Sequence, residues 1–441
     1  MSKDKPVLQL VTTGHVDHGK STAFGHLLVQ LGQVDTRLLK EENGDRKYLA
    51  LLAHHQEERE VGRTMALDWI NFETPKLFVS LLDAPGHRDF VKSMISGAAQ
   101  ADAAILFISA KKGELEAGIT TGEAKKQIKG GQTLEHLWLC RVLGISQFLV
   151  AVSKMDECNW SQEIYEQIKT HISEQMKKWG IDLAEVPVIP ISGWTGDNLV
   201  KPSEKMKWYD GPTLLEAIDA LTPPDRKKLE ELPLRIPIFN VYKIRGVGTV
   251  PIGVVEAGSL RPKDIVRIEP LGKETEVKSI EMYRKPIDLA RPGDGIGFVL
   301  KGLSKDELKS GYVACPPDQP IPVVTPTGYF LAQIILSEQA SGRGIVRTVN
   351  IGMTPLINIH TAEVPCRFAE LLEKLDSKTM QSVEQSPTYL EPGDAALVKM
   401  IPVKSVAMET YAKVPQLGRF AMRSAGRTIG AGIVTKIVPK A

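Results

Sequence analysis

The sequence is poor in the features that mark secreted, metal-bound or membrane proteins. Its four cysteines lie far apart among 441 residues and form no CxxC pair, so neither a disulfide framework nor a zinc knuckle is expected. No run approaches roughly 18 apolar residues, and the charged N-terminus lacks the apolar core of a signal peptide. We therefore expect a cytoplasmic protein without a membrane span. The net charge of +2 demands no polyanionic partner and leaves room for a local basic patch.

What the sequence does have is a globular composition, 42% hydrophobic and 24% charged, over a length typical of about three domains. In residues 1–221, short apolar runs alternate with amphipathic segments. This alternation predicts a mostly parallel sheet that is covered by helices on both faces. The predicted strands are 7–13, 77–83, 103–110, 148–153 and 186–192, and the predicted helices include 21–31, 90–100, 132–143 and 161–179.

The second half of the chain has a different pattern. Residues 222–235 combine a proline pair with dense charge, which is typical of a linker. The segment 236–320 is rich in Val and Ile, with frequent Gly and Pro turns, and predicts a small barrel. A second proline-rich break at 315–328 precedes another β-rich stretch, 321–441. The predicted architecture is one α/β domain followed by two all-β barrel domains.

The strongest local motif is GHVDHGKS at 14–21, which fits the pattern G-x-x-x-x-G-K-[ST] between a predicted strand and a predicted helix. Glycines let the backbone amides turn toward a β-phosphate. Lys20 is placed to bridge β- and γ-phosphate oxygens, and the Ser21 hydroxyl is placed to bind Mg²⁺. Because the following helix points its positive end at the loop, the motif predicts a phosphate-binding site.

A second motif, DAPGH, begins at the end of the strand 77–83. Asp83 would stand behind the Mg²⁺ ion, and the Gly86 amide would sense a γ-phosphate, which suits a switch. His87 would orient the attacking water. Thr64 precedes this motif, where a mobile switch would bring a threonine to Mg²⁺.

Two later motifs concern the base of a nucleotide. In SKMD, Asp156 would accept the N1–H and 2-amino hydrogens of guanine, which adenine does not offer in that pattern, while the stem of Lys154 would lie along the base. The segment 192–194 (SGW) would present an amide to the guanine O6 atom. Each motif is weak by itself, but their order along the chain favours a guanine-nucleotide site.

With these motifs the chain resembles a translational GTPase, and it is most similar to the elongation factor 1-alpha family of archaea and eukaryotes. Further stretches carry the resemblance through all three predicted domains. They are 83–102, 192–198, 211–219, 241–258, 360–376, 389–400 and 417–434.

The resemblance implies a P-loop GTPase domain followed by the two barrels. The implied function is GTP-dependent delivery of aminoacyl-tRNA to the ribosomal A site, with GTP hydrolysis stimulated by the ribosome. It also implies GTP/GDP and Mg²⁺ as cofactors, a guanine-nucleotide exchange factor as a further partner, no membrane partner, and a monomer. Phosphoryl transfer in such a protein relies on positioning and charge stabilisation.

The resemblance also assigns roles to single residues. His87 would position the catalytic water, and Ser21 and Thr64 would bind Mg²⁺. The nucleotide would be bound by Gly14, His15, Val16, Asp17, His18, Gly19, Lys20, Ser21, Thr22, Asp83, Gly86, Ser153, Lys154, Met155, Asp156, Ser192, Gly193 and Trp194.

Four residues of the barrels are implied to contact tRNA. Glu281 would pack near the terminal adenine, and Arg284 would lie close to the aminoacyl ester. Arg419 and Arg423 would meet the tRNA backbone, although structural ion pairs would account for these two arginines equally well. Contacts of this kind predict salt-sensitive binding.

The sequence departs from the family pattern at several positions. Ser153 stands where the family usually has Asn, and a hydroxyl makes fewer hydrogen bonds than an amide, which predicts a lower nucleotide affinity. Gly295 and Val254 replace an asparagine and an arginine near the expected aminoacyl pocket, and Ser424 replaces an aspartate. Arg63 replaces the isoleucine that, with Val16, is thought to shield the γ-phosphate from His87.

Three other functions stay open from the sequence. A GTPase that delivers a release or rescue protein usually has an extension before its first domain, whereas the P-loop here begins at Gly14. The GTPase subunit of sulfate adenylyltransferase shares the architecture but not the match at 192–198 and in the last domain. A nucleotide-free structural role disagrees with intact Lys20, Ser21 and Asp156.

The arginine in the switch gives a first testable prediction. Arg63 would either admit water to the γ-phosphate or touch the phosphate itself, so we expect Arg63→Ile to hydrolyse GTP more slowly than the wild type without ribosomes. Basal rates measured under single-turnover conditions test this. Equal rates would remove any role for Arg63 in hydrolysis.

Overall fold

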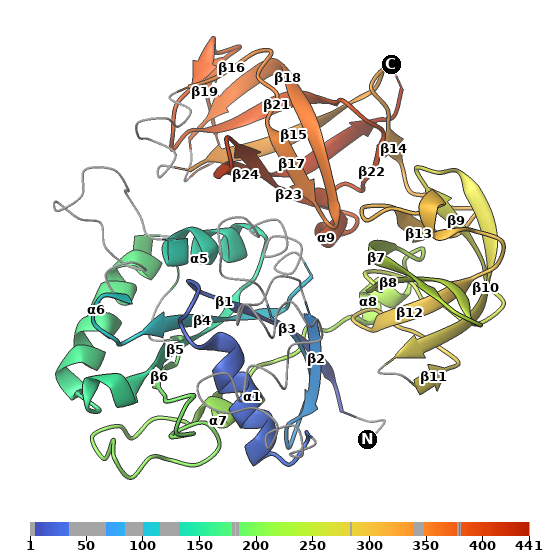
Figure 1. The fold of residues 1–441 in the computed structure, drawn as a ribbon. Helices are drawn as coiled ribbons and strands as arrows, with labels where there is room; N and C mark the ends of the chain where they lie inside the picture. Colours follow the sequence, from blue (N-terminus) through green and yellow to red (C-terminus); the bar gives the residue numbers. More distant parts are fainter. Residues whose placement is uncertain are drawn as a thin grey trace. The chain divides into compact units, whose positions relative to one another are not determined.

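A mostly parallel sheet organises the first of the two units into which the chain divides, Met1–Pro224 and Asp225–Ala441 (Figure 1). The computed structural model describes residues 5–34, 68–83, 100–114, 132–178, 181, 185–282, 285–337, 348–376, 379 and 381–440. Within these residues the sheet has the order β2-β3-β1-β4-β5-β6. Its strands are β1 (Val7–Thr13), β2 (Asp68–Glu73), β3 (Phe78–Asp83), β4 (Ala103–Ser109), β5 (Gln147–Ser153) and β6 (Val188–Pro190).

The five predicted strands are confirmed, and each pairs in parallel with its neighbour in the sheet. Strand β2 was not predicted, and it runs antiparallel to β3 at the edge of the sheet. Its buried Ile70 and Phe72 alternate with half-buried polar residues, so it lacks the continuous apolar run that marks the central strands.

Helices cover both faces of this sheet. They are α1 (Lys20–Gln30), α5 (Gln132–Val142), α6 (Gln162–Lys178) and α7 (Leu214–Asp219). The predicted helices 21–31, 132–143 and 161–179 are confirmed, whereas the predicted helix 90–100 lies outside the described residues. Phe24 of α1 and Leu214 of α7 pack with Leu10 of β1 in one apolar cluster, and α5 packs against β1 and β4. None of the described helices is long and apolar enough to cross a membrane.

The first barrel closes because its strands form a ring. In the described residues the order is β10-β12-β8-β7-β13-β9, and β9 pairs back with β10, while β11 extends the β10 edge. All neighbours in the ring are antiparallel. The strands are β7 (Ile236–Ile244), β8 (Gly248–Val254), β9 (Ile265–Glu269), β10 (Lys273–Met282), β11 (Lys285–Ile287), β12 (Gly295–Leu300) and β13 (Val313–Cys315).

The second barrel closes in the same way, through pairing of β17 with β18 around the ring β17-β23-β24-β15-β21-β18. The ring strands are β15 (Tyr329–Leu336), β17 (Leu356–Ile359), β18 (Ala362–Leu375), β21 (Ala395–Pro402), β23 (Arg419–Ser424) and β24 (Arg427–Val438). Shorter elements of the second unit are α8 (Lys227–Glu230), η6 (Lys305–Glu307), β14 (Val323–Val324), β16 (Val349–Asn350), β19 (Ser382–Gln385), β20 (Tyr389–Leu390), β22 (Val406–Ala407) and α9 (Pro415–Gly418). The predicted pair of barrels is therefore confirmed.

One turn recurs three times in the barrels. The sequences RPKD at 261–264, RPGD at 291–294 and EPGD at 391–394 each place a proline second and an aspartate fourth. In each turn the first residue's N–H donates to the aspartate Oδ2 atom, at 2.7, 2.8 and 2.8 Å. Burial raises the pKa of Asp294. The sequence thus reuses one compact turn to lead the chain into β9, β12 and β21.

A buried ion pair joins the two barrels within the second unit. The Nε and Nη2 atoms of Arg235 donate to Oε1 of Glu409 at 3.0 and 2.8 Å, and both side chains are at most 3% exposed. The Nη1 atom of Arg235 donates to the carbonyls of Leu234 and Gln319, and Lys413 adds a third contact to Glu409. Apolar residues of both barrels pack in a cluster of their own: Ala257, Val313, Cys315, Ile321, Ala407, Val414 and Leu417.

This pair generates a stability prediction. Glu409→Gln leaves the buried Arg235 charge without its counter-charge, so we expect the second unit to lose about 3 kcal/mol of unfolding free energy. Denaturant unfolding of the full chain, followed by circular dichroism, measures the loss. All six tryptophans lie before residue 209, in the first unit, so tryptophan fluorescence should report an unchanged transition.

The matched control is Glu370→Gln, which breaks the more exposed Lys399–Glu370 pair on the second barrel. An exposed pair contributes below about 1 kcal/mol, so this variant should unfold almost as the wild type does. Equal losses in the two variants would contradict a special role for the buried pair.

Candidate functional site

The predicted motifs meet at one edge of the first unit's sheet. The parallel strands β1, β3, β4, β5 and β6 all end there, and each is followed by a segment that carries polar or glycine residues. In open α/β sheets this carboxyl edge is where ligands bind. Asp83 ends β3, Ser153 ends β5, and Ser192 follows β6, so the sheet brings together motifs that are far apart in the sequence.

Close packing fixes the loop between β1 and α1. Gly14 has a φ of 135°, and a Cβ atom there would lie 2.5 Å from the carbonyl oxygen of Phe107 in β4, so the position requires glycine. Gly19 is also left-handed, with a φ of 77°, and immediately precedes α1. Because the first amides of a helix have no intrahelical partner, α1 directs N–H groups and its positive end toward this loop.

One histidine inside the loop, His18, has a structural role. The ring of His18 is buried, and its Nδ1 atom lies 2.9 Å from the carbonyl oxygen of Phe107. Burial lowers the pKa of His18 to about 4, so the ring is neutral at pH 7 and Nδ1 donates the hydrogen bond. His18 therefore ties the loop to the end of β4, whereas the sequence pattern predicted only its membership of the nucleotide site.

The ammonium group of Lys20 lies within the loop. It donates to the carbonyl oxygens of Gly14 and His15, at 3.1 and 2.9 Å, and the residue is 7% exposed. Burial lowers the pKa of Lys20 to about 8, and the nearby carboxylates of Asp83 and Asp17 partly oppose this. A cation that is held this way has little water to lose when an anion enters the loop.

Asp83 accepts hydrogen bonds from two elements. Its Oδ2 atom accepts from the Ser21 hydroxyl at 2.6 Å, and its Oδ1 atom accepts from the Thr12 hydroxyl at 2.7 Å. The carboxylate thus lies behind Ser21, and its role behind a bound Mg²⁺ stays a prediction. The contact with Thr12 was not predicted, because no pattern in β1 distinguishes that threonine from an ordinary buried strand residue.

The donor set fits Mg²⁺. Among the described residues no group of three or more His, Cys, Asp or Glu side chains is arranged to hold a metal ion. A single hydroxyl, that of Ser21, supported by the carboxylate of Asp83, suits an ion that keeps several waters and takes further ligands from phosphates. The second predicted ligand, Thr64, lies outside the described residues.

The Ser153 side chain links the guanine motif (SKMD, residues 153–156) to the phosphate loop (residues 14–21). Its hydroxyl donates to the carbonyl oxygen of His18 at 2.7 Å and also lies 3.2 Å from that of Ile108. The side chain is buried and bonds to the protein backbone. The serine at this position therefore links two loops directly. The lower nucleotide affinity expected from the missing amide stays a prediction.

Met155 and Asp156, the last two residues of the SKMD motif, have different surroundings. Met155 begins the short helix η4 (Met155–Cys158) and is fully buried, so its side chain anchors the loop in the core. The Oδ1 atom of Asp156 is buried and has no hydrogen-bond partner among the described residues. A carboxylate oxygen without a protein donor can accept a hydrogen bond from a bound molecule.

Lys154 makes an ion pair that the sequence did not predict. Its ammonium group donates to both carboxylate oxygens of Glu114, at 2.9 and 2.7 Å. Glu114 follows β4, and its Oε2 atom also accepts from the Ser109 hydroxyl at 2.8 Å. Glu114 is forty positions from Lys154 and belongs to no motif, so only the fold could identify it.

The SGW segment is fixed to α1. A Cβ atom on Gly193 would lie 2.9 Å from the backbone nitrogen of Ala23, and the carbonyl of Gly193 lies 2.8 Å from Nδ1 of His26. The hydroxyl of Ser192 accepts from the Thr195 amide at 3.1 Å. The close approach explains the glycine. Trp194 is 43% exposed.

The predicted tRNA residues lie on the barrels where described. Glu281 is exposed on β10 and pairs across the sheet with Gly297 of β12. Arg419 of β23 donates to the Tyr411 hydroxyl at 3.0 Å and lies over its ring, and Arg423 donates to the carbonyl of Gly426. Both arginines thus have structural contacts.

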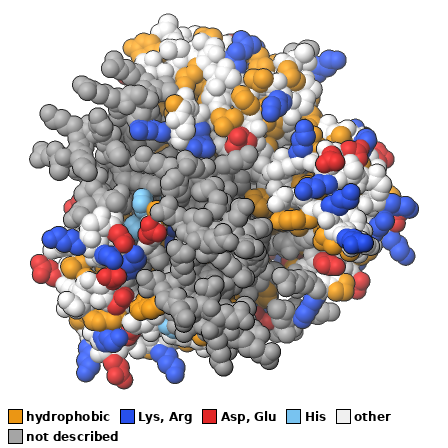
Figure 2. Space-filling model, viewed as in Figure 1, with side chains coloured by type: hydrophobic (Ala, Val, Ile, Leu, Met, Phe, Trp, Pro, Cys, Tyr) orange, Lys and Arg blue, Asp and Glu red, His pale blue; other side chains and the backbone are white. Residues whose placement is uncertain are grey.

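Five residues that the sequence singled out are not described: Arg63, Thr64, Gly86, His87 and Arg284. Two of the family departures are direct neighbours, because Val254 of β8 pairs with Gly295 of β12, and the Val254 side chain is buried. Figure 2 shows Lys and Arg side chains scattered over the barrels, with Asp and Glu among them.

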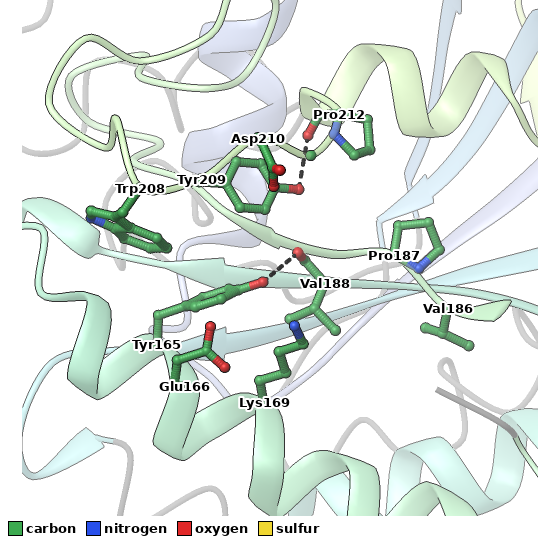
Figure 3. Close-up of a pocket in the computed structure, with 11 residues that line it drawn as sticks. Tyr165, Glu166, Lys169, Val186, Pro187, Val188, Trp208, Tyr209, Asp210 and Pro212 are labelled. Atoms are coloured by element: carbon green, nitrogen blue, oxygen red, sulfur yellow. Dashed lines mark hydrogen bonds between the residues drawn. The ribbon is translucent and has the colours of Figure 1, made fainter. Parts of the chain in front are cut away.

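A pocket of about 470 Å³ lies elsewhere in the first unit, between α6 and the segment before α7 (Figure 3). Its aromatic polar groups are used internally. The hydroxyl of Tyr165 donates to the Val188 carbonyl at 3.0 Å, and that of Tyr209 donates to the Pro212 carbonyl at 3.1 Å. This pocket therefore belongs to the scaffold that holds the segment before α7.

Comparisons with known families cover all three parts of the chain. A model of the Elongation factor Tu GTP binding domain matches residues 5–224. A model of Elongation factor Tu domain 2 matches residues 248–315, and a model named GTP-eEF1A C-terminal domain-like matches residues 330–435.

Similar proteins match over their whole length. The chain is 47% identical to Elongation factor 1-alpha of Ignicoccus hospitalis, over 99% of this chain and 97% of the relative. It is 48% identical to Elongation factor 1-alpha of Staphylothermus marinus, over 100% and 98%. The solved structure of the S. cerevisiae Ski7 GTPase-like domain, bound to GDP and inorganic phosphate, has a TM-score of 0.76 at 15% identity over 98% and 97%, which shows a shared fold.

The environment of Lys20 predicts a pH dependence. Its lowered pKa of about 8 means that the ammonium charge is present below pH 8 and is lost as the pH rises through that value. We therefore expect the affinity for GDP to fall about tenfold between pH 7 and pH 9. Equilibrium titrations with a fluorescent GDP analogue measure this change.

The control is Lys20→Arg, whose guanidinium keeps its charge over this range. Its affinity is expected to be lower than that of the wild type at pH 7 but to vary little with pH. A wild-type affinity that does not change between pH 7 and pH 9 would show that Lys20 stays charged.

Proposed function

The chain belongs to the elongation factor 1-alpha family, and on this premise we propose that the carboxyl edge of its sheet is where the guanine nucleotide binds. Members of this family are translational GTPases, and this chain hydrolyses GTP and delivers aminoacyl-tRNA during translation elongation. What remains to be assigned is the part that each residue plays.

One observation carries the proposed site: its loops are held to one another by contacts within the protein. Ser21 of the phosphate loop bonds to Asp83, Ser153 of the guanine motif bonds to the backbone of His18, and Gly193 packs on α1. A site whose parts are held in place loses little conformational freedom when it binds its ligand. The three loops correspond to phosphate, base and base-edge recognition.

The phosphate end would be held by the 14–21 loop. Backbone amides at the start of α1 would receive phosphate oxygens, and the Lys20 ammonium would move from the carbonyls of Gly14 and His15 to the phosphates. The hydroxyls of Ser21 and Thr64 would bind Mg²⁺, which when bound would neutralise charge that develops on the phosphates. The Gly86 amide would report the γ-phosphate, and His87 would orient the attacking water.

The base end would be read by Asp156. Its unpartnered Oδ1 atom would accept from guanine N1–H or the 2-amino group, and Oδ2 would accept the other. The stem of Lys154 would flank the base, and an amide of the 192–194 segment would meet guanine O6. Adenine offers no donor at the first position, so this arrangement would select guanine.

The family resemblance supports the remaining assignments. Glu281 and Arg284 would face the acceptor end of the tRNA, and Arg419 and Arg423 would meet its backbone from the second barrel. Delivery to the ribosomal A site, a guanine-nucleotide exchange factor, a monomeric state and a cytoplasmic location follow as expectations for a factor that works with ribosomes. The proposed domain limits are 1–221, 236–320 and 321–441, with 222–235 as the linker.

Protection of the aminoacyl ester tests the function. Charged tRNA is incubated with the protein plus GTP or plus GDP, and spontaneous deacylation is followed. We expect several-fold slower deacylation with GTP only, because the GTP state would bury the chain end despite Val254 and Gly295. Loss of this protection at high salt would follow from phosphate contacts.

The control uses Asp156→Asn with xanthosine triphosphate, whose base carries a carbonyl where guanine carries the 2-amino group. An Asn amide donates to that carbonyl, so the variant should lose protection with GTP and recover it with xanthosine triphosphate. No protection from wild-type protein that binds GTP would contradict aminoacyl-tRNA delivery and would direct the search to another cargo.

A further inference from the structure

Glu114 lies outside every motif of the nucleotide site but makes several bonds at its guanine end. It follows β4 at the carboxyl edge of the sheet, beside the end of β5. Both of its carboxylate oxygens accept from the Lys154 ammonium, at 2.9 and 2.7 Å, and Oε2 also accepts from the Ser109 hydroxyl. The carboxylate thus joins the end of β4 to the guanine motif.

The pair is better placed than an ordinary surface ion pair. The side chains of Lys154 and Glu114 are 25% and 27% exposed, and the contact is bidentate. Partial burial by itself raises the pKa of Glu114, but hydrogen bonds from Lys154 and Ser109 outweigh it, and the pKa is lowered overall. Glu114 is therefore ionised at neutral pH, and its bonds are charge-assisted.

The residues on either side of Lys154 fix its backbone but not its side chain. Its φ of 59° is left-handed, a conformation that few non-glycine residues adopt. Ser153, just before it, is held to the phosphate loop, and Met155, just after it, is buried in the core. The side chains of Ser153 and Met155 thus fix the loop on both sides of Lys154. The long Lys154 side chain is oriented by its ion pair with Glu114.

We propose that Glu114 is a positioning residue of the guanine-nucleotide site. Its carboxylate holds the Lys154 side chain extended along the position of the base, so that this side chain is already ordered when the nucleotide binds. This inference rests on the proposed nucleotide site. Ordering a lysine side chain in advance removes an entropy cost from binding, and this gain would be felt equally by any purine that Lys154 flanks. Recognition of the 2-amino group would stay with Asp156.

The test compares Glu114→Gln with the wild type in binding GDP and inosine diphosphate, whose base lacks the 2-amino group. We expect the variant to bind both ligands about tenfold more weakly, through faster dissociation. The ratio of its affinities for GDP and inosine diphosphate should be the same as that of the wild type. In a Lys154→Ala background, Glu114→Gln should have no further effect. A purely structural role of Glu114 would instead persist in that background.

Glu157→Gln is the matched control. It removes the same charge from a pair of the same unit, Lys111–Glu157, which makes a single 3.2 Å contact and is 42% and 44% exposed. It should bind GDP as the wild type does. Equal weakening in the two variants would assign the effect to net charge and overturn the proposal.

The remaining outcomes are also decisive. Unchanged GDP binding by Glu114→Gln would overturn the positioning role, and tighter binding would show that Glu114 competes with the nucleotide for Lys154. Glu114→Asp, which keeps the charge on a shorter stem, should recover part of the affinity and separates positioning from misfolding. Failure of the wild type itself to bind GDP would refute the proposed nucleotide site and, with it, this inference.

Discussion

The hydrogen bonds of the buried Asp83 carboxylate hold together the carboxyl edge of the first unit's sheet, where we propose that the nucleotide binds. Asp83 ends β3, and its two oxygens bond to Thr12 at the end of β1 and to Ser21 in the first turn of α1. A buried charge without such donors would be strongly unfavourable, so its partners are held where they are. One side chain thereby sets the spacing of two strands and the start of a helix, and the phosphate loop lies between these fixed ends.

The same logic continues along the edge. Each loop is attached to its neighbour by a polar side chain that bonds to backbone: His18 to Phe107, Ser153 to His18, and His26 to Gly193. In each case a side chain contacts a backbone carbonyl oxygen, and paired backbone groups are the rule in a buried loop. Ser153, which stands where the family usually has an asparagine, joins the two loops through its hydroxyl group.

The second unit relies on a different constraint. Its two closed barrels each bury their own core, and the Arg235–Glu409 pair lies among apolar residues that both barrels contribute. A buried ion pair does not by itself add stability, but it permits only the geometry that satisfies both charges. The exposed pairs on the barrel surfaces impose no comparable condition. Joined in this way, the barrels can present their outer faces as one surface.

The sequence by itself determined the five parallel strands of the first unit, the phosphate loop at 14–21 and the order of the motifs, because apolar runs, glycines and local spacing are properties of contiguous residues. Only the tertiary structure decided that β2 lies antiparallel at the edge, that Val254 and Gly295 are cross-strand neighbours, and that Glu114 meets Lys154. The last two of these contacts join residues about forty positions apart. No periodicity in a single chain records which distant segments the packing of a sheet brings together.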